Sequence, residues 1–243
     1  MIRPKLTFLS PETVDRAIDE AYELLWNPGV RVHYDEALKL LADAGASVDM
    51  KSRVARIPRA LAEKAVETAP SSFHLYNFEG EAVIHYGDDD IHFDPGSAAI
   101  EIADYDDTQS RAPVTADCEN FVRVAEMLPQ IDALATSIVC ADVPQSMADW
   151  YRLYLLLLYG RKPIVTGTFA IETFSIMHDL LVTVAGSAEA LAEKPRAVFD
   201  VCPSPPLLWS DITCANLIDC ARTGVPAELV SMPLTGATGP QTV

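Results

Sequence analysis

The chain has 243 residues, 49% of them hydrophobic and 22% charged, which is enough apolar material for a sizeable core and excludes an intrinsically disordered chain. Its 35 acidic and 18 basic residues give a formal net charge of −17, and a surface of this sign repels phosphate backbones, which argues against nucleic acid as a partner. The charge would favour a cationic ligand or a basic partner, although such a charge more often serves solubility alone.

Three features of the sequence predict a cytoplasmic protein with no part in a membrane. The segment Met1-Ile-Arg-Pro-Lys5 lacks the apolar core of a signal peptide. The longest apolar stretch near a helix centre, Leu153 to Tyr159, is too short to span a bilayer. The cysteines are scattered and odd in number, which indicates reduced thiols rather than a disulfide framework; they are Cys118, Cys140, Cys202, Cys214 and Cys220.

Residues 1–114 predict an α+β extension. Ser10 as N-cap and Pro11 at the first helical position begin a helix that ends at Asn27-Pro-Gly29. Two more helices are predicted over 34–44, with Leu38, Leu40 and Leu41 inward, and over 58–68. Strands are predicted at 54–57, 73–76, 82–86 and 91–93, followed by a hairpin of 98–103 with 111–114.

Residues 115–243 predict alternating strands and helices. A helix over 115–127 precedes four strand–helix units of about 30 residues each, the repeat of right-handed βαβ crossovers and a parallel sheet. The strands are predicted at 133–140, 163–168, 197–202 and 227–232, and the helices at 146–159, 171–185, 188–193 and 211–223. Four units are half of a (β/α)8 barrel, and periodicity alone does not separate this TIM barrel from an open doubly wound sheet. No G-x-G-x-x-G motif follows the first strand, so nothing supports dinucleotide binding.

Five segments, taken in order, resemble the trimethylamine methyltransferase family over essentially the whole chain, and the last two are the most specific. They are Asn27-Pro-Gly-Val-Arg-Val32, the helix from Glu36 to Val48, Ile57-Pro58 through Ala69-Pro70, Asp200-Val-Cys-Pro-Ser-Pro-Pro-Leu207, and Gly224-Val-Pro226 through Ser231-Met-Pro-Leu-Thr-Gly-Ala-Thr-Gly-Pro240.

The resemblance implies a TIM-barrel enzyme with an N-terminal extension. Such enzymes, found in methylamine metabolism and methanogenesis, move a methyl group from a methylated amine, or a quaternary amine such as a betaine, to the cobalt of a separate corrinoid protein. The corrinoid, of the cobalamin type, belongs to that partner, so no cofactor is expected to bind this chain directly. Family members are about twice as long, and a homo-oligomer is expected at full length.

The chain therefore resembles the N-terminal half of the family, with an extension over 1–114 and the first half of a barrel over 115–243. In the trimethylamine members the catalytic pyrrolysine lies in the second half, so the catalytic residue is expected beyond Val243. We expect the chain alone to be inactive, and unstable or self-associating, because a half-barrel exposes two strand edges. A TIM-barrel hydrolase or lyase of unknown substrate, or a catalytically inactive truncated chain, are the alternatives.

Ligands of a barrel bind at the carboxyl ends of its strands, and a cationic ammonium requires aromatic faces and a carboxylate. Asp142 is the candidate cation partner, or else a helix cap. Phe169 and Trp209 are candidate cage faces, or else packing. Gly236 and Gly239 would admit a corrin face or form a turn. The predicted substrate-binding set is Asp142, Thr168, Phe169, Ser204, Trp209, Thr235, Gly236 and Gly239.

Other polar residues are interpreted as structural. Asp200, inside a predicted strand, must be paired, and a structural pairing is favoured over catalysis. His85 and His92, with the acidic run 88–90 between them, are interpreted as a polar hairpin tip rather than a metal site. Cys140 and Cys202 lack a zinc-binding spacing, and His178 lies in mid-helix away from any nucleophile, so no metal and no catalytic triad are predicted.

Overall fold

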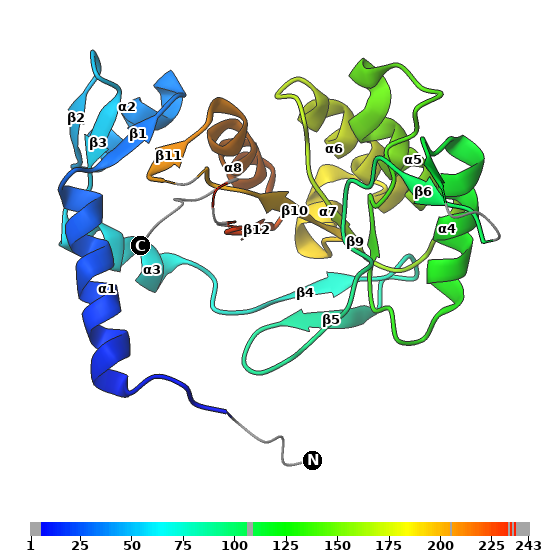
Figure 1. Ribbon diagram of the computed structural model, residues 1–243, viewed down its shortest axis with the longest axis horizontal. Coiled ribbons are helices and arrows are strands. Elements are labelled where there is room, and N and C mark those ends of the chain that lie inside the picture. Colours follow the sequence, from blue (N-terminus) through cyan, green and yellow to red (C-terminus); the bar gives the residue numbers. More distant parts are fainter. Residues whose placement is uncertain (1–5, 106–108, 205, 233, 235, 237–243) are drawn as a thin grey trace. The chain divides into compact units, whose positions relative to one another are not determined.

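The computed structural model describes residues 6–105, 109–204, 206–232, 234 and 236 (Figure 1). The chain forms two compact units. The first comprises residues 1–69, 204–210 and 233–243, and the second comprises residues 70–203 and 211–232. The domain division at residue 114 follows a change in sequence pattern and stays a prediction.

The first unit contains a small mixed sheet with the strand order β11-β1-β3-β2. Strand β1 pairs in parallel with β11 and antiparallel with β3. Its elements are α1 (Pro11–Trp26), β1 (Val30–Val32), α2 (Asp35–Asp43), β2 (Ser47–Asp49), β3 (Val54–Arg56), α3 (Arg59–Thr68) and β11 (Leu208–Trp209).

The start and the end of α1 follow from local chemistry. The Ser10 side chain accepts a hydrogen bond from the backbone N–H of Thr13 at 3.3 Å, and Pro11 opens the helix, as the sequence predicts. After the helix, Gly29 has a φ of 88°, and a Cβ there would lie 2.7 Å from the carbonyl oxygen of Ala55. Only glycine fits this close passage of the chain beside β3.

The second unit is organised around a four-stranded parallel sheet of order β12-β10-β9-β8. Its strands are β8 (Leu134–Ala135), β9 (Ile164–Thr166), β10 (Ala197–Val201) and β12 (Ala227–Leu229). The helical elements are α4 (Thr115–Met127), the 3-10 turn η1 (Gln145–Met147), α5 (Ala148–Tyr159), α6 (Thr173–Ala185), α7 (Ala188–Glu193) and α8 (Asp211–Thr223). Two antiparallel hairpins complete it, β4 (Phe73–Tyr76) with β5 (Ala82–Tyr86), and β6 (Ile102–Ala103) with β7 (Ser110–Arg111).

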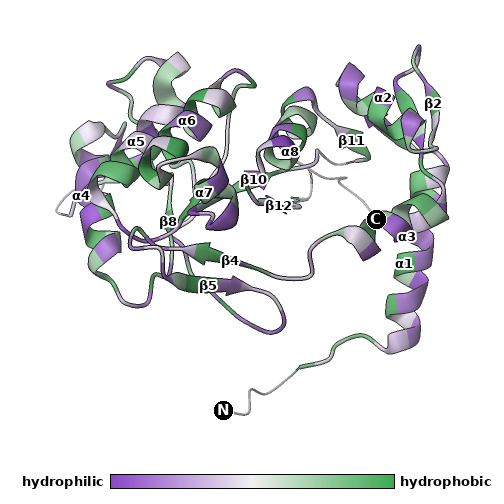
Figure 2. Cartoon of the chain, turned by 180° about the vertical axis from the view of Figure 1, so that it is seen from behind, coloured by the Kyte–Doolittle hydropathy of each residue, from purple (hydrophilic) through white to green (hydrophobic). Residues whose placement is uncertain are grey.

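Alternating residues of this sheet face two different layers. Leu134, Ile164 and Phe199 belong to the larger apolar core, which they form with the helices. Ala135, Val165 and Val198 pack against Leu75 and Ile84 of the β4–β5 hairpin instead. Both faces are therefore covered, as expected for a parallel sheet, with helices on one side and a hairpin on the other (Figures 1 and 2).

Most predicted elements are confirmed, and α4, α7 and α8 have the predicted bounds. Three predictions are wrong. Residues 91–93 form no strand, β8 is far shorter than 133–140, and Leu40 is 50% exposed rather than inward. The sequence analysis also missed β1, β2 and β11. These strands are two or three residues long, so each depends on its partners rather than on a pattern of its own.

The mixed α/β class with four parallel strands is confirmed. All five cysteines are free thiols, as predicted. Within the described residues, every helix is too short or too polar to cross a membrane.

Candidate functional site

Asp142 follows the end of β8 and supports a neighbouring helix. Its Oδ1 accepts a hydrogen bond of 2.9 Å from the backbone N–H of Thr115, the first residue of α4. An N–H group at this position has no partner within its own helix, so a carboxylate from another segment satisfies it. Asp142 is exposed as well, so its other oxygen is open to solvent.

Thr168 and Phe169 follow the end of β9 and are held from two sides. The hydroxyl of buried Thr168 donates to Oδ1 of buried Asn216 at 2.9 Å, and Nδ2 of Asn216 donates back to the hydroxyl at 2.6 Å. The backbone N–H of Phe169 donates to Oδ2 of Asp149 at 2.7 Å. The Phe169 ring is 52% exposed.

The guanidinium of Arg152 lies over the Phe169 ring, 4.6 Å from its centroid. One face of this ring is therefore occupied by a cation. The positive charge of Arg152 offsets the negative electrostatic potential of the ring, so a second cation would be attracted less strongly. This geometry favours an apolar wall over a cation cage for Phe169. A bound ammonium would need its counter-charge elsewhere.

The other predicted site residues lie in the first unit or outside the described residues. Ser204 forms a narrow loop closed by two backbone hydrogen bonds with Leu208, and Trp209 ends β11, opposite Val32 of β1. Gly236 has a φ of 76°, a left-handed conformation that favours glycine. Thr235 and Gly239 lie outside the described residues. Thr168 and Phe169 thus lie on one loop of the second unit, whereas Ser204, Trp209 and Gly236 belong to the first.

A second set of polar residues lies on the hairpin-facing side of the parallel sheet. Asp200 is paired in register with Glu228 of β12, and each precedes the last residue of its strand. Burial raises the pKa of Asp200 to about 8, and the nearby carboxylates of Glu228 and Asp94 add to the effect.

The pairing predicted for Asp200 is therefore with another acid rather than with a base. Its Oδ1 is buried and has no hydrogen-bond partner among the described residues. A structural pairing would ordinarily satisfy both oxygens, because an unpaired buried acceptor costs free energy. Asp200 is thus the least compensated buried carboxyl of this sheet.

Tyr86 of β5 connects the hairpin to this acidic pair. Burial raises the pKa of its phenol, and the nearby carboxylates of Glu228, Asp94 and Asp200 add to the effect. The Tyr86 ring stacks on Phe73, with centroids 4.7 Å apart and planes 5° from parallel, so its position is fixed. Beside it lies a pocket of about 330 Å³, whose floor includes Ala133 and Val165.

The walls of this pocket combine aromatic rings with acidic groups. Tyr86, Phe93 and His92 supply the rings, and Asp94 and Glu228 supply the carboxylates. Such a lining suits a small cation with apolar substituents, because rings and carboxylates both attract positive charge. Sequence reasoning missed Glu228, Tyr86 and Asp94. A second acidic residue was present in the next predicted strand, but Glu228 is the second residue of 227–232 and Asp200 the fourth of 197–202, so only the observed register reveals the pairing.

The hairpin histidines make local contacts. Nδ1 of His85 lies 2.9 Å from Oδ2 of Asp90, and Nε2 of His92 donates to the carbonyl oxygen of His85 at 3.1 Å. Cys140 is hydrogen-bonded to Cys118. Nε2 of His178 is buried beside the stacked ring of Phe174 and has no hydrogen-bond partner among the described residues. In the described part of the chain, no three such side chains are arranged to hold a metal ion.

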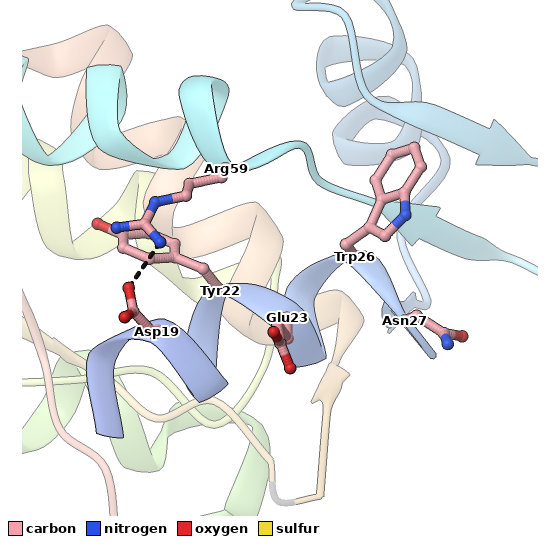
Figure 3. A pocket seen from close by; sticks show the side chains of 6 residues that line it. All are labelled: Asp19, Tyr22, Glu23, Trp26, Asn27 and Arg59. Atoms are coloured by element: carbon pink, nitrogen blue, oxygen red, sulfur yellow. Dashed lines mark hydrogen bonds and ion pairs between the residues drawn. The ribbon is translucent and has the colours of Figure 1, made fainter. Parts of the chain in front are cut away.

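The first unit has a separate open pocket of about 610 Å³ between α1 and α3 (Figure 3). Arg59 lies over the Tyr22 ring, 4.8 Å from its centroid, and donates to Asp19 at 2.6 Å. The side chains of Glu23 and Trp26 also line it. Arg59 is paired with Asp19 in this pocket, so the negative charge there is partly neutralised. The pocket beside Tyr86 therefore attracts a cation more strongly.

Comparison with known proteins decides the family. The family model described as trimethylamine methyltransferase (MTTB) matches residues 2–243. The chain belongs to this family. It is 27% identical over 216 residues to trimethylamine methyltransferase MttB of Desulfitobacterium hafniense (strain DSM 10664 / DCB-2), a match that covers 89% of this chain and 44% of that protein.

Two further relatives match over a similar share of their own length, and one of them has a different name. Trimethylamine methyltransferase MttB of Methanosarcina thermophila is 25% identical over 90% of this chain and 46% of its own length. The glycine betaine methyltransferase of Desulfitobacterium hafniense (strain Y51) is 24% identical over 98% of this chain and 49% of its own length. The chain thus spans about half the length of the curated relatives that it matches.

Proposed function

We propose that the chain forms part of a methyltransferase that moves a methyl group from a methylated amine to the cobalt of a corrinoid carried by a separate protein. Its membership of the trimethylamine methyltransferase family supports this reaction class. Relatives named for trimethylamine and for glycine betaine support a substrate with a methylated, cationic nitrogen.

The observation that carries the proposal is the pocket beside Tyr86. Glu228 and Asp94 supply negative charge, and Tyr86 and Phe93 supply aromatic surface, around a space of about 330 Å³. Glu228 lies one residue before the end of β12, and α/β proteins bind their ligands near such carboxyl ends, whereas Phe93 is bonded to Asp132 and Ala133 just before β8. We assign to Glu228 the role of counter-charge for the ammonium and to Tyr86 that of an aromatic wall.

The chemistry divides between the acceptor and the protein. The Co(I) corrinoid supplies the nucleophile, and a positively charged nitrogen is the better leaving group for a methyl. The work left to the protein is to bind, orient and partly desolvate the amine, which is positioning and electrostatics. Glu228 would hold the cation, and the apolar floor of Ala133 and Val165 would exclude water from the transferred methyl.

The proposal extends to architecture and setting. The four βα units would be the first half of a (β/α)8 barrel, with the hairpin-facing side of the sheet directed toward its interior. The corrinoid would come with its own protein and bind to no residue assigned here. A cytoplasmic location and a homo-oligomeric complete enzyme belong to the same proposal.

Two measurements test it. Calorimetric titration of the chain with tetramethylammonium chloride and with glycine betaine should show binding that weakens in the Glu228→Gln variant. Incubation with each methylated amine and Co(I) cobalamin, with the Desulfitobacterium glycine betaine methyltransferase as positive control, should show the absorbance of the methylated corrinoid for the complete enzyme. The absence of both binding and transfer for every methylated amine would refute the proposed function.

A further inference from the structure

The largest fully buried side chain of the described residues is that of Arg152, on α5, which is 1% exposed. Its partner, Asp149, lies one turn earlier and is 2% exposed. Nη2 of Arg152 lies 3.2 Å from Oδ1 of Asp149, and Nε of Arg152 donates to the carbonyl oxygen of Ala148 at 3.0 Å. The pair thus belongs to one helix and is closed to water.

The remaining bonds of this pair go to the ends of two strands. Nη1 of Arg152 donates to the carbonyl oxygen of Thr136, the first residue after β8, at 2.8 Å. Oδ2 of Asp149 accepts from the backbone N–H of Phe169 at 2.7 Å and from the hydroxyl of Thr173 at 2.8 Å. One ion pair therefore joins the loop after β8 to the loop after β9 and to the start of α6.

Stability alone does not account for such a pair. Removing two charges from water costs several kcal/mol, so a buried ion pair often adds nothing over apolar residues of the same size. A buried ion pair does fix the positions of its neighbours, because the guanidinium and the carboxylate form hydrogen bonds only in a few directions. Here two of the directed bonds, to Thr136 and to Phe169, reach loops outside the helix that carries the pair.

The loop after β9 is also fixed on its other side. Thr168 is bonded to Asn216 of α8, and a Cβ on Gly167 would lie 3.2 Å from the carbonyl oxygen of Asp200. The backbone of this loop is therefore constrained from α5, α8 and β10. Yet the ring of Phe169 remains half exposed. A rigidly held side chain that is not part of the core is typical of a residue that contacts a ligand.

We propose that Asp149 and Arg152 are positioning residues, which fix Thr168 and Phe169 at the end of β9 relative to the end of β8. The inference rests on the proposed function, since Val165 of β9 lines the pocket assigned to the amine and the loop with Thr168 and Phe169 continues from the same strand. Arg152 acts through Phe169 and Thr136, and Asp149 acts through the backbone of Phe169.

The test removes the charges and keeps the volume. In the double variant Asp149→Asn/Arg152→Met, the amide oxygen can still accept from Phe169, while both charges and the bond to Thr136 are lost. Its matched control is Arg16→Met/Glu20→Gln, which neutralises an exposed ion pair of α1 with an N–O distance of 3.2 Å. Thermal unfolding reports stability, and amide hydrogen exchange reports the order of residues 167–172.

We expect the double variant to unfold within a few degrees of the wild type, with amide exchange in residues 167–172 at least tenfold faster. In the complete enzyme, methyl transfer should fall at least tenfold in kcat, with a smaller change in KM. The control variant should change neither quantity. Unchanged exchange and unchanged kcat in a stable double variant would overturn the inference.

A second variant covers the case in which the double variant does not fold. Thr173→Val removes one hydrogen bond to Asp149 and preserves the shape of the side chain, and it should accelerate exchange at residues 167–172 severalfold. Unchanged exchange here would also overturn the inference. If the wild type binds no quaternary ammonium and transfers no methyl group, the proposed function fails, whereas the exchange measurement still decides whether the pair orders the loop.

Discussion

Two pairs of ionisable residues, on the two sides of the parallel sheet, differ in how their buried charge is compensated. On the helix side, Asp149 is neutralised by Arg152, and both oxygens of the carboxylate have partners. On the hairpin side, Asp200 faces another acid, Glu228, and its Oδ1 has no partner in the described part of the chain. The first pair is complete without a ligand, while the second has an excess of negative charge.

The difference separates two kinds of buried polar residue. A compensated pair with every atom bonded specifies a conformation. An uncompensated acidic pair retains a proton at a pH where an isolated carboxyl would be ionised. It also attracts a cation, because no positive side chain neutralises it. The amine is therefore expected at the second pair, and the first holds the loop beside it.

The largest expected effect is the loss of one member of the compensated pair. Arg152→Met leaves Asp149 buried without its counter-charge, which should lower the free energy of unfolding by about 3–5 kcal/mol. Urea denaturation at pH 7 measures this loss. The matched control, Arg16→Met on the exposed face of α1, should cost less than about 0.5 kcal/mol. A cost below about 1 kcal/mol for Arg152→Met would show that the two pairs do not differ as described.

The uncompensated pair should make stability depend on pH. The pKa of Asp200 is raised to about 8 in the folded protein, from an ordinary value of 3.8. The folded state therefore holds a proton that the unfolded state releases above about pH 4, so stability falls as the pH rises from about 4 to about 8. The slope is at most about 1.4 kcal/mol per pH unit for a fully buried group and smaller for this partly exposed one.

The variant Asp200→Asn, which cannot ionise, should remove this part of the slope. We compare the free energies of unfolding of the variant and the wild type by urea denaturation at pH 5 and at pH 9. The difference, variant minus wild type, should be more positive at pH 9. Asp43→Asn, at an exposed position of α2, is the control and should keep the slope of the wild type. The same slope in Asp200→Asn and the wild type would mean that Asp200 ionises normally.

A third expected effect concerns the ligand. Glu228→Gln removes the proposed counter-charge of the pocket without changing its size, and the affinity for tetramethylammonium should fall about tenfold, or about 1.4 kcal/mol. Titration calorimetry at pH 7 measures it. Glu126→Gln, a carboxylate of α4 that does not line this pocket, should bind as the wild type does. Equal affinity in the wild type and both variants would mean that the ammonium does not bind beside Glu228.

The smallest effect is expected at the link between the hairpin and the sheet. Tyr86→Phe keeps the stacking on Phe73 and removes the phenol hydroxyl, whose pKa is raised by burial and by the nearby carboxylate of Glu228, so stability at pH 7 should fall by about 1 kcal/mol. Thermal unfolding detects a change of this size. No loss of stability would mean that the hydroxyl makes no favourable contact with the acidic pair.

Much of the local structure could be predicted because its causes are local. Ser10 and Pro11 begin α1, and the bounds of α4, α7 and α8 follow from short-range patterns. The parallel sheet followed from the repeat of strand and helix. The strands β1, β2 and β11 could not be predicted, because each has only two or three residues; β1 and β11 form by pairing with each other across a long stretch of chain, and β2 pairs with the neighbouring β3.

The candidate site was predicted less completely than the fold. The sequence indicated the loop with Thr168 and Phe169. It also predicted that Asp200 is paired, but it did not identify the partner. Arg152 and Asp149 were not identified, because a charged pair within a helix looks like an ordinary exposed i, i+3 contact until its burial is known. Glu228 was missed because nothing near it in the chain marks it as facing Asp200.

The sequence by itself determined the family, the acidic charge, the helices with their caps and the alternation that forms a parallel sheet, since each depends on neighbouring residues or on a repeated pattern. Only the tertiary structure decided which charges are compensated. Register places Glu228 beside Asp200, and the packing of α5 buries Arg152 under Phe169. Both contacts join segments far apart in the chain, so burial and pairing, rather than residue type, gave these side chains their chemistry.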